Sequence, residues 1–252
     1  MKKILFVIAL AVVAVACQKQ PDVTAYIDDA GDCIFENTVI RYRIPGQKNP
    51  LISSGMIAEL RAQENKEVFT DNGYPAVAAS FNAGGSAIVV EDSLYFPHEN
   101  FNSFEVVEQT SKHVTFKLEY PAFAAGTDSL TLIRTVTLGK DSYFCQINDI
   151  YKSLKKQVGI LVAVGYDVHG TELHEIGKDY IISWEKAPSG DGMAGYGLAM
   201  PMTDVFEYEE GDDFAAAYFD TRTGRPVNYG LGFCWSKGAH ADFDSWADEV
   251  RF

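Results

Sequence analysis

Basic residues are scarce in this chain of 252 residues. Lys and Arg together number 21 against 35 Asp and Glu, and the formal net charge is −14. Nucleic-acid binding depends on clustered Lys and Arg that neutralise phosphates, so this balance argues against a nucleic-acid partner. It also argues against electrostatic docking on anionic lipid. The acidic balance favours solubility and does not itself identify a partner.

Cysteine is also scarce, with four residues and no C-x-x-C pair. This spacing argues against a zinc ribbon and against a thioredoxin-type redox site. If Cys17 is modified, as argued below, Cys33, Cys145 and Cys234 remain, and at most one disulfide can form among three thiols. Cys145 and Cys234 lie within apolar strand patterns, so we expect both to be small buried hydrophobic residues.

Several catalytic motifs are absent. There is no G-x-S-x-G, and the Gly-rich stretch 192–197 follows no strand-to-helix crossover, which excludes a phosphate cradle there. No H-x-x-x-H spacing supports a catalytic zinc. The acidic stretches 28–32 and 209–213 match no EF-hand loop, so we expect solvated turns, with Ca²⁺ as the alternative. The sequence therefore predicts no metal site and no cofactor.

The chain has one prominent apolar run, Ile4 to Val15, which is too short for a comfortable membrane span. It follows Lys2 and Lys3, as in a signal peptide. The residues Ala14-Val15-Ala16-Cys17 then resemble a bacterial lipobox, although Leu is usual where Ala14 stands. We expect residues 1–16 to be removed and Cys17 to be lipidated. The alternative is an ordinary secretory signal cut near Ala16.

On this reading the protein is anchored in a bacterial cell envelope by its lipid alone. Residues 17–37 would form a tether and lead-in, and residues 38–252 a single domain. The tether lacks a clear acidic export signal, which favours the periplasmic side over the cell surface.

Helical periodicity is absent before Ala241. Short alternating segments recur instead every eight to fifteen residues, as in a β-sandwich or barrel. We predict an all-β fold, a large antiparallel β-sandwich with a short C-terminal helix in which Phe243, Trp246 and Val250 share one face. Residues 130–138 and 143–151 should form a long hairpin, residues 158–166 a central strand, and residues 65–85 a loop-rich stretch.

Arg134 is the most informative single residue. Strand periodicity over residues 130–138 places it on the apolar face, where a guanidinium requires a partner. That partner is either a core acid such as Asp149 or the carboxylate of a ligand. Arg41 and Arg43 share one face of an early strand and could also clamp a carboxylate, or could be solvated edge charges.

Two histidines are candidates for acid–base chemistry. Strand geometry puts Asp167 and His169 on the same side, and His174 lies in the segment just after them. Plain surface histidines are the alternative. Among the aromatic residues near turns, Tyr196 and Trp235 could stack on the C–H faces of sugar rings. For Phe101 and Trp184 we expect ordinary core positions.

Four sequence blocks are informative in their order and spacing: residues 40–52, 158–165, 195–201 and 232–238. Together they resemble the exported Bacteroidota family called domain of unknown function forty-eight sixty-one, often encoded among pectin and uronate-polysaccharide degradation genes. The resemblance implies a sandwich similar to galactose mutarotase and an acidic oligosaccharide ligand. Carried onto this sequence, the resemblance implies six candidate residues for the ligand site: Arg41, Asn49, Arg134, Tyr196, Trp235 and Lys237. Relatives have a longer His- and Gly-rich segment before the first Gly-Gly. The corresponding residues 65–85 of this chain contain no His.

Three hypotheses follow. The first is an envelope enzyme acting on uronate-containing oligosaccharides by lyase, hydrolase or mutarotase-like chemistry. In it His169, His174 or Lys237 would act as acid or base, and Arg41 and Arg134 would hold a carboxylate. The second is a non-catalytic glycan-binding lipoprotein that uses Tyr196 and Trp235 as platforms. The third is a structural lipoprotein without a glycan ligand.

Overall fold

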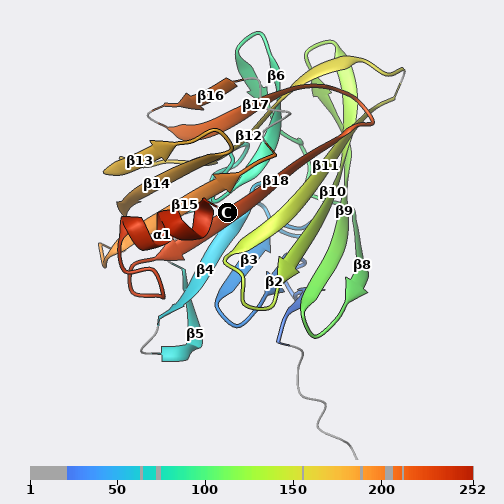
Figure 1. The fold of residues 1–252 in the computed structure, drawn as a ribbon. Coiled ribbons are helices and arrows are strands. Elements are labelled where there is room, and N and C mark those ends of the chain that lie inside the picture. The colour runs from blue at the N-terminus through green and yellow to red at the C-terminus, as the bar shows by residue number, and fades with distance from the viewer. Residues whose placement is uncertain are drawn as a thin grey trace, which may run out of the picture.

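The computed structural model describes residues 22–62, 65–71, 75–154, 156–187, 190–201, 207–211 and 213–251. The lipobox prediction at Cys17 lies outside them. Almost every element is an antiparallel strand, and one short helix lies near the C-terminus (Figure 1). This confirms the all-β prediction. Within the described residues, no helix is long and apolar enough to cross a membrane.

The largest sheet has eight strands in the order β13-β14-β15-β18-β11-β10-β9-β8. Its hairpin β10–β11 was expected, and Arg134 stands directly opposite Asp149 in it. The strands are β8 (Ser103–Gln109), β9 (His113–Ala125), β10 (Asp128–Gly139), β11 (Phe144–Ser153), β13 (Leu173–Ile176), β14 (Tyr180–Lys186), β15 (Met193–Ala199) and β18 (Pro226–Trp235).

A second sheet has five strands in the order β16-β17-β12-β6-β7, with β12 at its centre as predicted. These strands are β6 (Gly85–Val90), β7 (Ser93–Tyr95), β12 (Gly159–Asp167), β16 (Glu207–Glu210) and β17 (Phe214–Arg222). The expected strand over residues 204–208 falls largely outside the described residues.

A third sheet has the order β1-β2-β3-β4-β5, formed by β1 (Thr24–Ile27), β2 (Cys33–Glu36), β3 (Ile40–Ile44), β4 (Ile57–Ala62) and β5 (Asn65–Asp71). Two expectations differ from it. Strands β1 and β2 lie within the segment assigned to the lead-in, so the sheet begins before residue 38. Strand β5 lies in the stretch expected to be loop-rich. The sequence did not predict this strand because its backbone pairs with β4 without an alternating apolar pattern.

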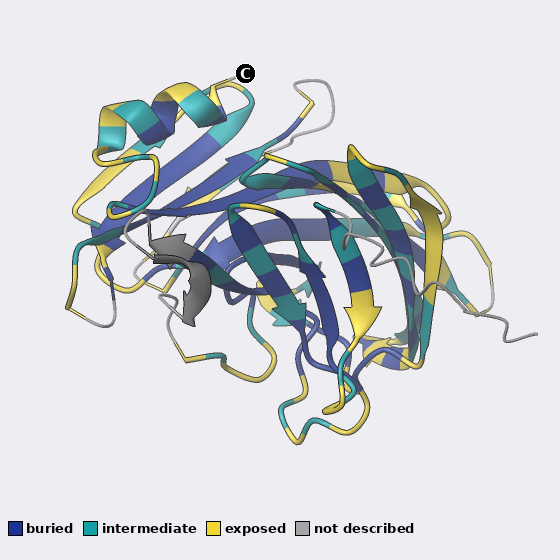
Figure 2. Ribbon diagram, turned by 90° about the horizontal axis from the view of Figure 1, so that it is seen from below, coloured by how far each residue is buried: buried dark blue, intermediate teal, exposed yellow. Residues whose placement is uncertain are grey.

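One hydrophobic cluster takes side chains from all three sheets, so the eight-stranded sheet packs against the two five-stranded sheets (Figures 1 and 2). A parallel bridge from Met56 to Asn82 joins those two sheets. The alternating pattern of β9 is realised here: Val114, Phe116 and Leu118 are fully buried. Phe101 is also part of this core, as predicted.

Helix α1 (Phe243–Val250) covers the outer face of β14 and β15. Asp242 caps it by accepting a hydrogen bond from the Ser245 N–H at 2.9 Å. Trp246 and Val250 are buried and Phe243 packs against the same cluster, which confirms the predicted face. A side chain at Gly197 would overlap Trp246 and Val250, so glycine there lets the helix approach the sheet. The inner face of β14 and β15 remains available for the core.

Candidate functional site

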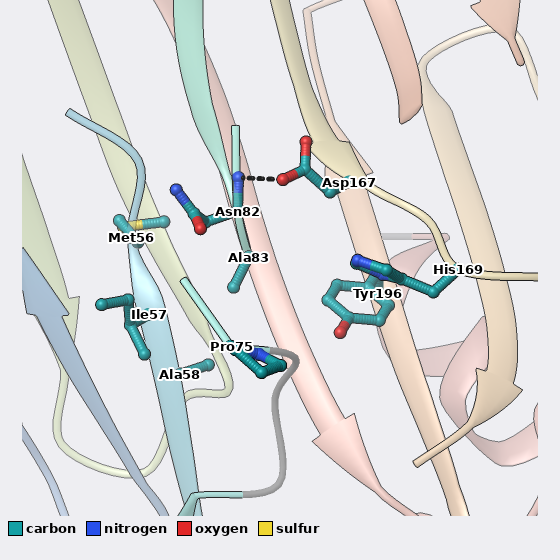
Figure 3. Close-up of a pocket in the computed structure, with 9 residues that line it drawn as sticks. All are labelled: Met56, Ile57, Ala58, Pro75, Asn82, Ala83, Asp167, His169 and Tyr196. Atoms are coloured by element: carbon teal, nitrogen blue, oxygen red, sulfur yellow. Dashed lines mark hydrogen bonds between the residues drawn. The ribbon is translucent and has the colours of Figure 1, made fainter. Parts of the chain in front are cut away.

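A small pocket lies where β12 ends. Asp167 is the last residue of β12, and His169 follows two positions later on the same side of the pocket (Figure 3). Met56 and Ile57 form the opposite wall. The remaining lining residues are Ala58, Pro75, Asn82, Ala83 and Tyr196. The enclosed volume of about 10 Å³ suits a single water molecule, so only one edge of a larger ligand could enter.

Asp167 anchors the wall of this pocket. Its Oδ2 accepts the Ser80 hydroxyl and, at 2.8 Å, the Asn82 N–H, while Oδ1 accepts the Phe81 N–H at 3.2 Å. Burial raises the pKa of Asp167, and these hydrogen bonds oppose the rise. Asn82 has a positive φ of 53°, which Asn tolerates better than most residues. The carboxylate therefore fixes residues 80–82 against the end of β12.

Glu185 on β14 lies beside the pocket and is fully buried. Its Oε2 accepts the backbone N–H of His169 at 2.7 Å. Its Oε1 has no hydrogen-bond partner among the described residues and lies 3.8 Å from Nδ1 of His169. Burial raises the pKa of Glu185 to about 7. The hydrogen bond from His169 opposes this rise, the charge of Asp167 adds to it, and a hydrogen bond from Tyr196 opposes it.

His169 has the complementary electrostatics. Its side chain is 34% exposed, and burial lowers its pKa despite the opposing charge of Asp213. Near neutral pH it is therefore a neutral imidazole. With the pKa of Glu185 raised to about 7 and that of His169 lowered, about half of Glu185 still carries its proton at neutral pH, opposite a neutral imidazole.

Aromatic and hydroxyl groups enclose the Glu185 side of the site. Ser183 and Glu185 share the inward face of β14, since they are two residues apart. The Tyr166 hydroxyl lies 2.9 Å from Oγ of Ser183. The rings of Tyr166 and Tyr196 stack with centroids 5.3 Å apart. These side chains exclude water from Glu185, which is the physical cause of its raised pKa.

This arrangement can move protons near neutral pH. A carboxyl group whose pKa is about 7 can both donate and accept a proton, and a neutral imidazole can accept one. Among the described residues, no Lys or Arg lines the pocket. These residues therefore offer acid–base chemistry without a fixed positive charge.

Arg134 lies inside the core, in the arrangement that the ion-pair alternative predicted. It is fully buried, and its Nε and Nη2 donate to the two carboxylate oxygens of Asp149 at 2.9 and 2.8 Å. It also donates to the Ser54 carbonyl and to Ser86, while the Tyr229 hydroxyl donates to Asp149 at 2.6 Å. A ligand that approaches from solvent cannot reach this guanidinium.

Arg41, Arg43 and Asn49 lie on the third sheet and its flanking loop. Nε of Arg41 is 2.6 Å from a Glu36 oxygen, and Nη1 of Arg43 is 3.3 Å from an Asp32 oxygen. Asn49 donates to both oxygens of Asp32 at 3.1 and 3.0 Å. Both guanidinium groups are thus already paired with carboxylates, and none of these side chains lines the pocket.

The remaining candidates are dispersed. His174 is exposed on the edge strand β13. Lys237 forms an ion pair with Asp191, and its Nζ lies 5.8 Å from the ring centre of Trp235. Trp235 and Tyr196 are 5% and 2% exposed, so neither offers a flat platform to solvent. Of the predicted site residues, the pocket brings together His169 and Tyr196, with Asp167 beside them.

The cysteines and acidic loops form no further centre among the described residues. Cys33, Cys145 and Cys234 are buried and unpaired, which confirms the expected buried positions of Cys145 and Cys234. Over the same part of the chain, no group of three or more His, Cys, Asp or Glu side chains is placed to hold a metal ion.

Comparison with known proteins places this fold. The model of the family described as "Domain of unknown function (DUF4861)" matches residues 59–250. The chain belongs to this family. No curated protein sequence matches the chain.

The fold is similar to a solved structure described as "Putative kojibiose phosphorylase from human microbiome", with a TM-score of 0.52 and 9% identity. The match covers 92% of this chain and 36% of the other, so the DUF4861 protein corresponds to about a third of that chain. At this identity the likeness concerns the fold alone.

Glu185 is the site residue that the sequence analysis missed, although a signal for it exists. Within Ile181-Ile182-Ser183-Trp184-Glu185, Ser183 is the one polar residue before the carboxylate, so the pattern predicts a strand that is buried on both faces. An acid at the end of such a strand requires a hydrogen-bond or ion-pair partner, as Arg134 does. Its spatial neighbour His169 is 16 residues away, on the other side of the β13 strand, and only the tertiary structure shows the contact.

Proposed function

We propose that this DUF4861 protein acts on a carbohydrate by general acid–base catalysis, with Glu185 and His169 as the acid and base. The observation that carries this proposal is the buried Oε1 of Glu185, which has no hydrogen-bond partner among the described residues and faces His169 beside a pocket. A buried carboxyl without a partner is costly unless a ligand or a proton satisfies it.

The reaction class that best fits is proton transfer at the anomeric centre of a sugar, as in a mutarotase. Neutral His169, which is 34% exposed, would take the proton of the anomeric hydroxyl. The fully buried Glu185 would supply a proton to the ring oxygen through the one water molecule that the pocket can hold, which opens the ring. Closure on the other face returns both protons. This chemistry requires an acid and a base within reach of one ring edge, and it requires no nucleophile.

The charge of the pocket favours a neutral sugar over a uronate. β-Elimination from a uronate is helped when a cation neutralises the carboxylate, and no Lys or Arg lines the pocket in the part of the chain that the structure describes. Arg41 and Arg134, which were expected to hold that carboxylate, are paired elsewhere. The uronate-containing ligand remains a prediction that depends on the family resemblance.

One further observation supports a carbohydrate ligand. The fold is similar to that of a solved structure described as a "Putative kojibiose phosphorylase", which is a carbohydrate enzyme.

The test uses reducing oligosaccharides in two pools, one neutral and one containing uronates. Polarimetry follows anomer interconversion, and mass spectrometry follows cleavage. We expect accelerated interconversion for neutral sugars, its loss in Glu185→Gln, and normal activity in Glu91→Gln, a matched change at an exposed acid. Shorter products would instead identify cleavage: a hydrolase adds one water across the broken bond, whereas a lyase leaves an unsaturated fragment that is one water lighter than the hydrolytic product. Absence of any reaction in both pools would contradict catalysis.

We also propose that Cys17 anchors the protein by lipid in a bacterial envelope, on the periplasmic side. The lipobox-like Ala14-Val15-Ala16-Cys17 supports this proposal. Mass spectrometry of the N-terminal peptide from membranes should show an acylated Cys17, and Cys17→Ser should release the protein into the soluble fraction. A soluble wild-type protein would contradict the anchor.

A further inference from the structure

A wider groove lies on the outer face of the β16-β17-β12-β6-β7 sheet. It has a volume of about 770 Å³, which is in the range of ligand sites. None of its residues lines the pocket beside Glu185. The lining residues are Val89, Asp92, Leu94, Leu161, Glu207, Tyr208, Glu209, Phe214 and Tyr218. Strands β16, β17, β12 and β6 run side by side to form this face (Figure 1).

The floor of the groove is apolar and partly exposed. Strand register places Val89 directly opposite both Leu161 and Leu94, so these three side chains form one row across the sheet. Tyr218 continues the floor toward β16, and Phe214 lies at one end, where it packs against Phe81 with ring centres 5.7 Å apart. Five adjacent strands span about 19 Å at the usual strand spacing. An occupant that fills this width is extended rather than a single small ring.

The rim of the groove consists of carboxylates. Asp92 stands at the turn between β6 and β7, and Glu207 and Glu209 stand on β16 at the far side. Within the described residues, Asp92 and Glu207 have no ion-pair partner, and Glu209 accepts the Tyr218 hydroxyl. No Lys or Arg is among the described residues that line the groove. An occupant that supplies hydrogen-bond donors and carries no negative charge suits this rim.

We propose that this groove binds a neutral oligosaccharide chain. Its hydroxyl groups would donate to the rim carboxylates, while the C–H faces of its rings would pack on Tyr218 and the apolar floor. Asp92, Glu207 and Glu209 all act electrostatically on Tyr218, so these acceptors surround the ring that would stack on the sugar. Over the described residues, no group of three or more His, Cys, Asp or Glu side chains is placed to hold a metal ion, which favours a polyol over a point cation. The ligand class rests on the proposed function, whereas the location of the site does not.

Two variants isolate the groove. Asp92→Asn removes a rim charge at a φ of 61°, which Asn tolerates, and Tyr218→Ala removes the central ring. Glu91→Gln is the matched control, because it makes the same charge change in the same turn but does not line the groove. Each groove variant should weaken glycan binding about tenfold, while interconversion of short reducing sugars remains normal.

Affinity electrophoresis tests this proposal with gels that contain galactan, xyloglucan, starch or polygalacturonate. We expect at least one neutral polysaccharide to retard the wild type, Glu91→Gln and Glu185→Gln, and to retard Asp92→Asn and Tyr218→Ala less. Equal loss of retardation in Glu185→Gln and the groove variants would overturn the second site and leave the proposed function intact.

A wild type that no neutral polysaccharide retards would also overturn the proposal. Binding of an oligolysine peptide in that case, lost in Asp92→Asn, would show a groove for a cationic partner. Failure of the proposed function has a different signature: absence of turnover by the wild type with normal groove-dependent retardation.

Discussion

Two buried polar clusters lie in this sandwich, and they differ in how completely their groups are satisfied. In the first, Arg134 donates two hydrogen bonds to Asp149, and Ser86 and Tyr229 complete the network. In the second, Oε2 of Glu185 accepts the backbone N–H of His169 and Tyr196 also donates to the carboxyl group, while Oε1 has no partner within hydrogen-bond distance among the described residues. Both lie in strands, and both carry charged residue types with no exposed surface.

This difference in hydrogen bonding distinguishes a structural ion pair from a residue that could act on a ligand. A bidentate pair closed on all sides has no group left for a ligand, and its carboxylate and guanidinium stabilise each other. A carboxyl with an open oxygen keeps its burial cost, and that cost appears as a pKa raised to about 7. A buried charge in an apolar strand is therefore informative only after its partners are known.

The largest expected effect comes from breaking the satisfied cluster. Arg134→Leu leaves Asp149 buried without its cation, and should lower the free energy of unfolding by about 3–5 kcal/mol. Urea unfolding measures this loss. Adding Asp149→Leu should recover much of it, because the unpaired charge is then gone. A single variant within about 1 kcal/mol of the wild type would contradict a closed structural pair.

Glu185→Gln should lower activity and leave the folded state intact, the opposite of the effect expected for Arg134→Leu. The substitution keeps the shape of the side chain but removes its proton, so sugar interconversion should fall about 10²–10⁴-fold while the folded state persists at neutral pH. Polarimetry and urea unfolding on the same preparation give the two values. Activity loss that merely follows loss of folded protein would assign Glu185 to the structural class with Arg134.

The pH dependence of stability sharpens the comparison further. The pKa of Glu185 rises from its ordinary 4.5 to about 7 on folding, so the folded state binds its proton more tightly. The stabilisation is complete below about pH 4.5 and is lost as the pH rises to about 7, with a total of about 3 kcal/mol. Unfolding free energies of wild type minus Glu185→Gln should fall by about this amount over that window. A flat difference would contradict the shifted pKa.

The smallest expected effect concerns Tyr196. Its hydrogen bond favours the ionised form of Glu185, so Tyr196→Phe should raise the pKa of Glu185 further and move the basic limb of the activity profile to higher pH. The stability change should be about 1 kcal/mol, the net value of one hydrogen bond. Rate profiles against pH for both proteins measure the shift. An unchanged limb together with a large loss of stability would indicate that Tyr196 serves only packing.

Much of the fold follows from local patterns in the sequence. Alternation identifies β9, the hairpin β10–β11 and the central strand β12, because each buries one or both faces against the core. Strand β5 escapes such a search, since backbone pairing with β4 requires no apolar alternation. Strands β1 and β2 escape because four-residue strands carry little periodicity.

Only part of the candidate site could be predicted from the sequence. Asp167 and His169 follow from strand geometry, because they are two positions apart at the end of β12. Glu185 reaches them through the contact between β14 and the end of β12, which no spacing in the chain encodes. The pattern that identified Arg134 reports burial of a charge, and burial is shared by structural and functional residues.

The most direct test of this account is the protonation state of Glu185 itself. Infrared difference spectra between about pH 6 and about pH 8 detect the carbonyl stretch of a protonated carboxyl group, and Glu185→Gln identifies its source. We predict one carboxyl band that disappears across this interval in the wild type and is absent from the variant. A wild type whose carboxyl groups are all ionised by about pH 6 would contradict the distinction between the open cluster and the closed one.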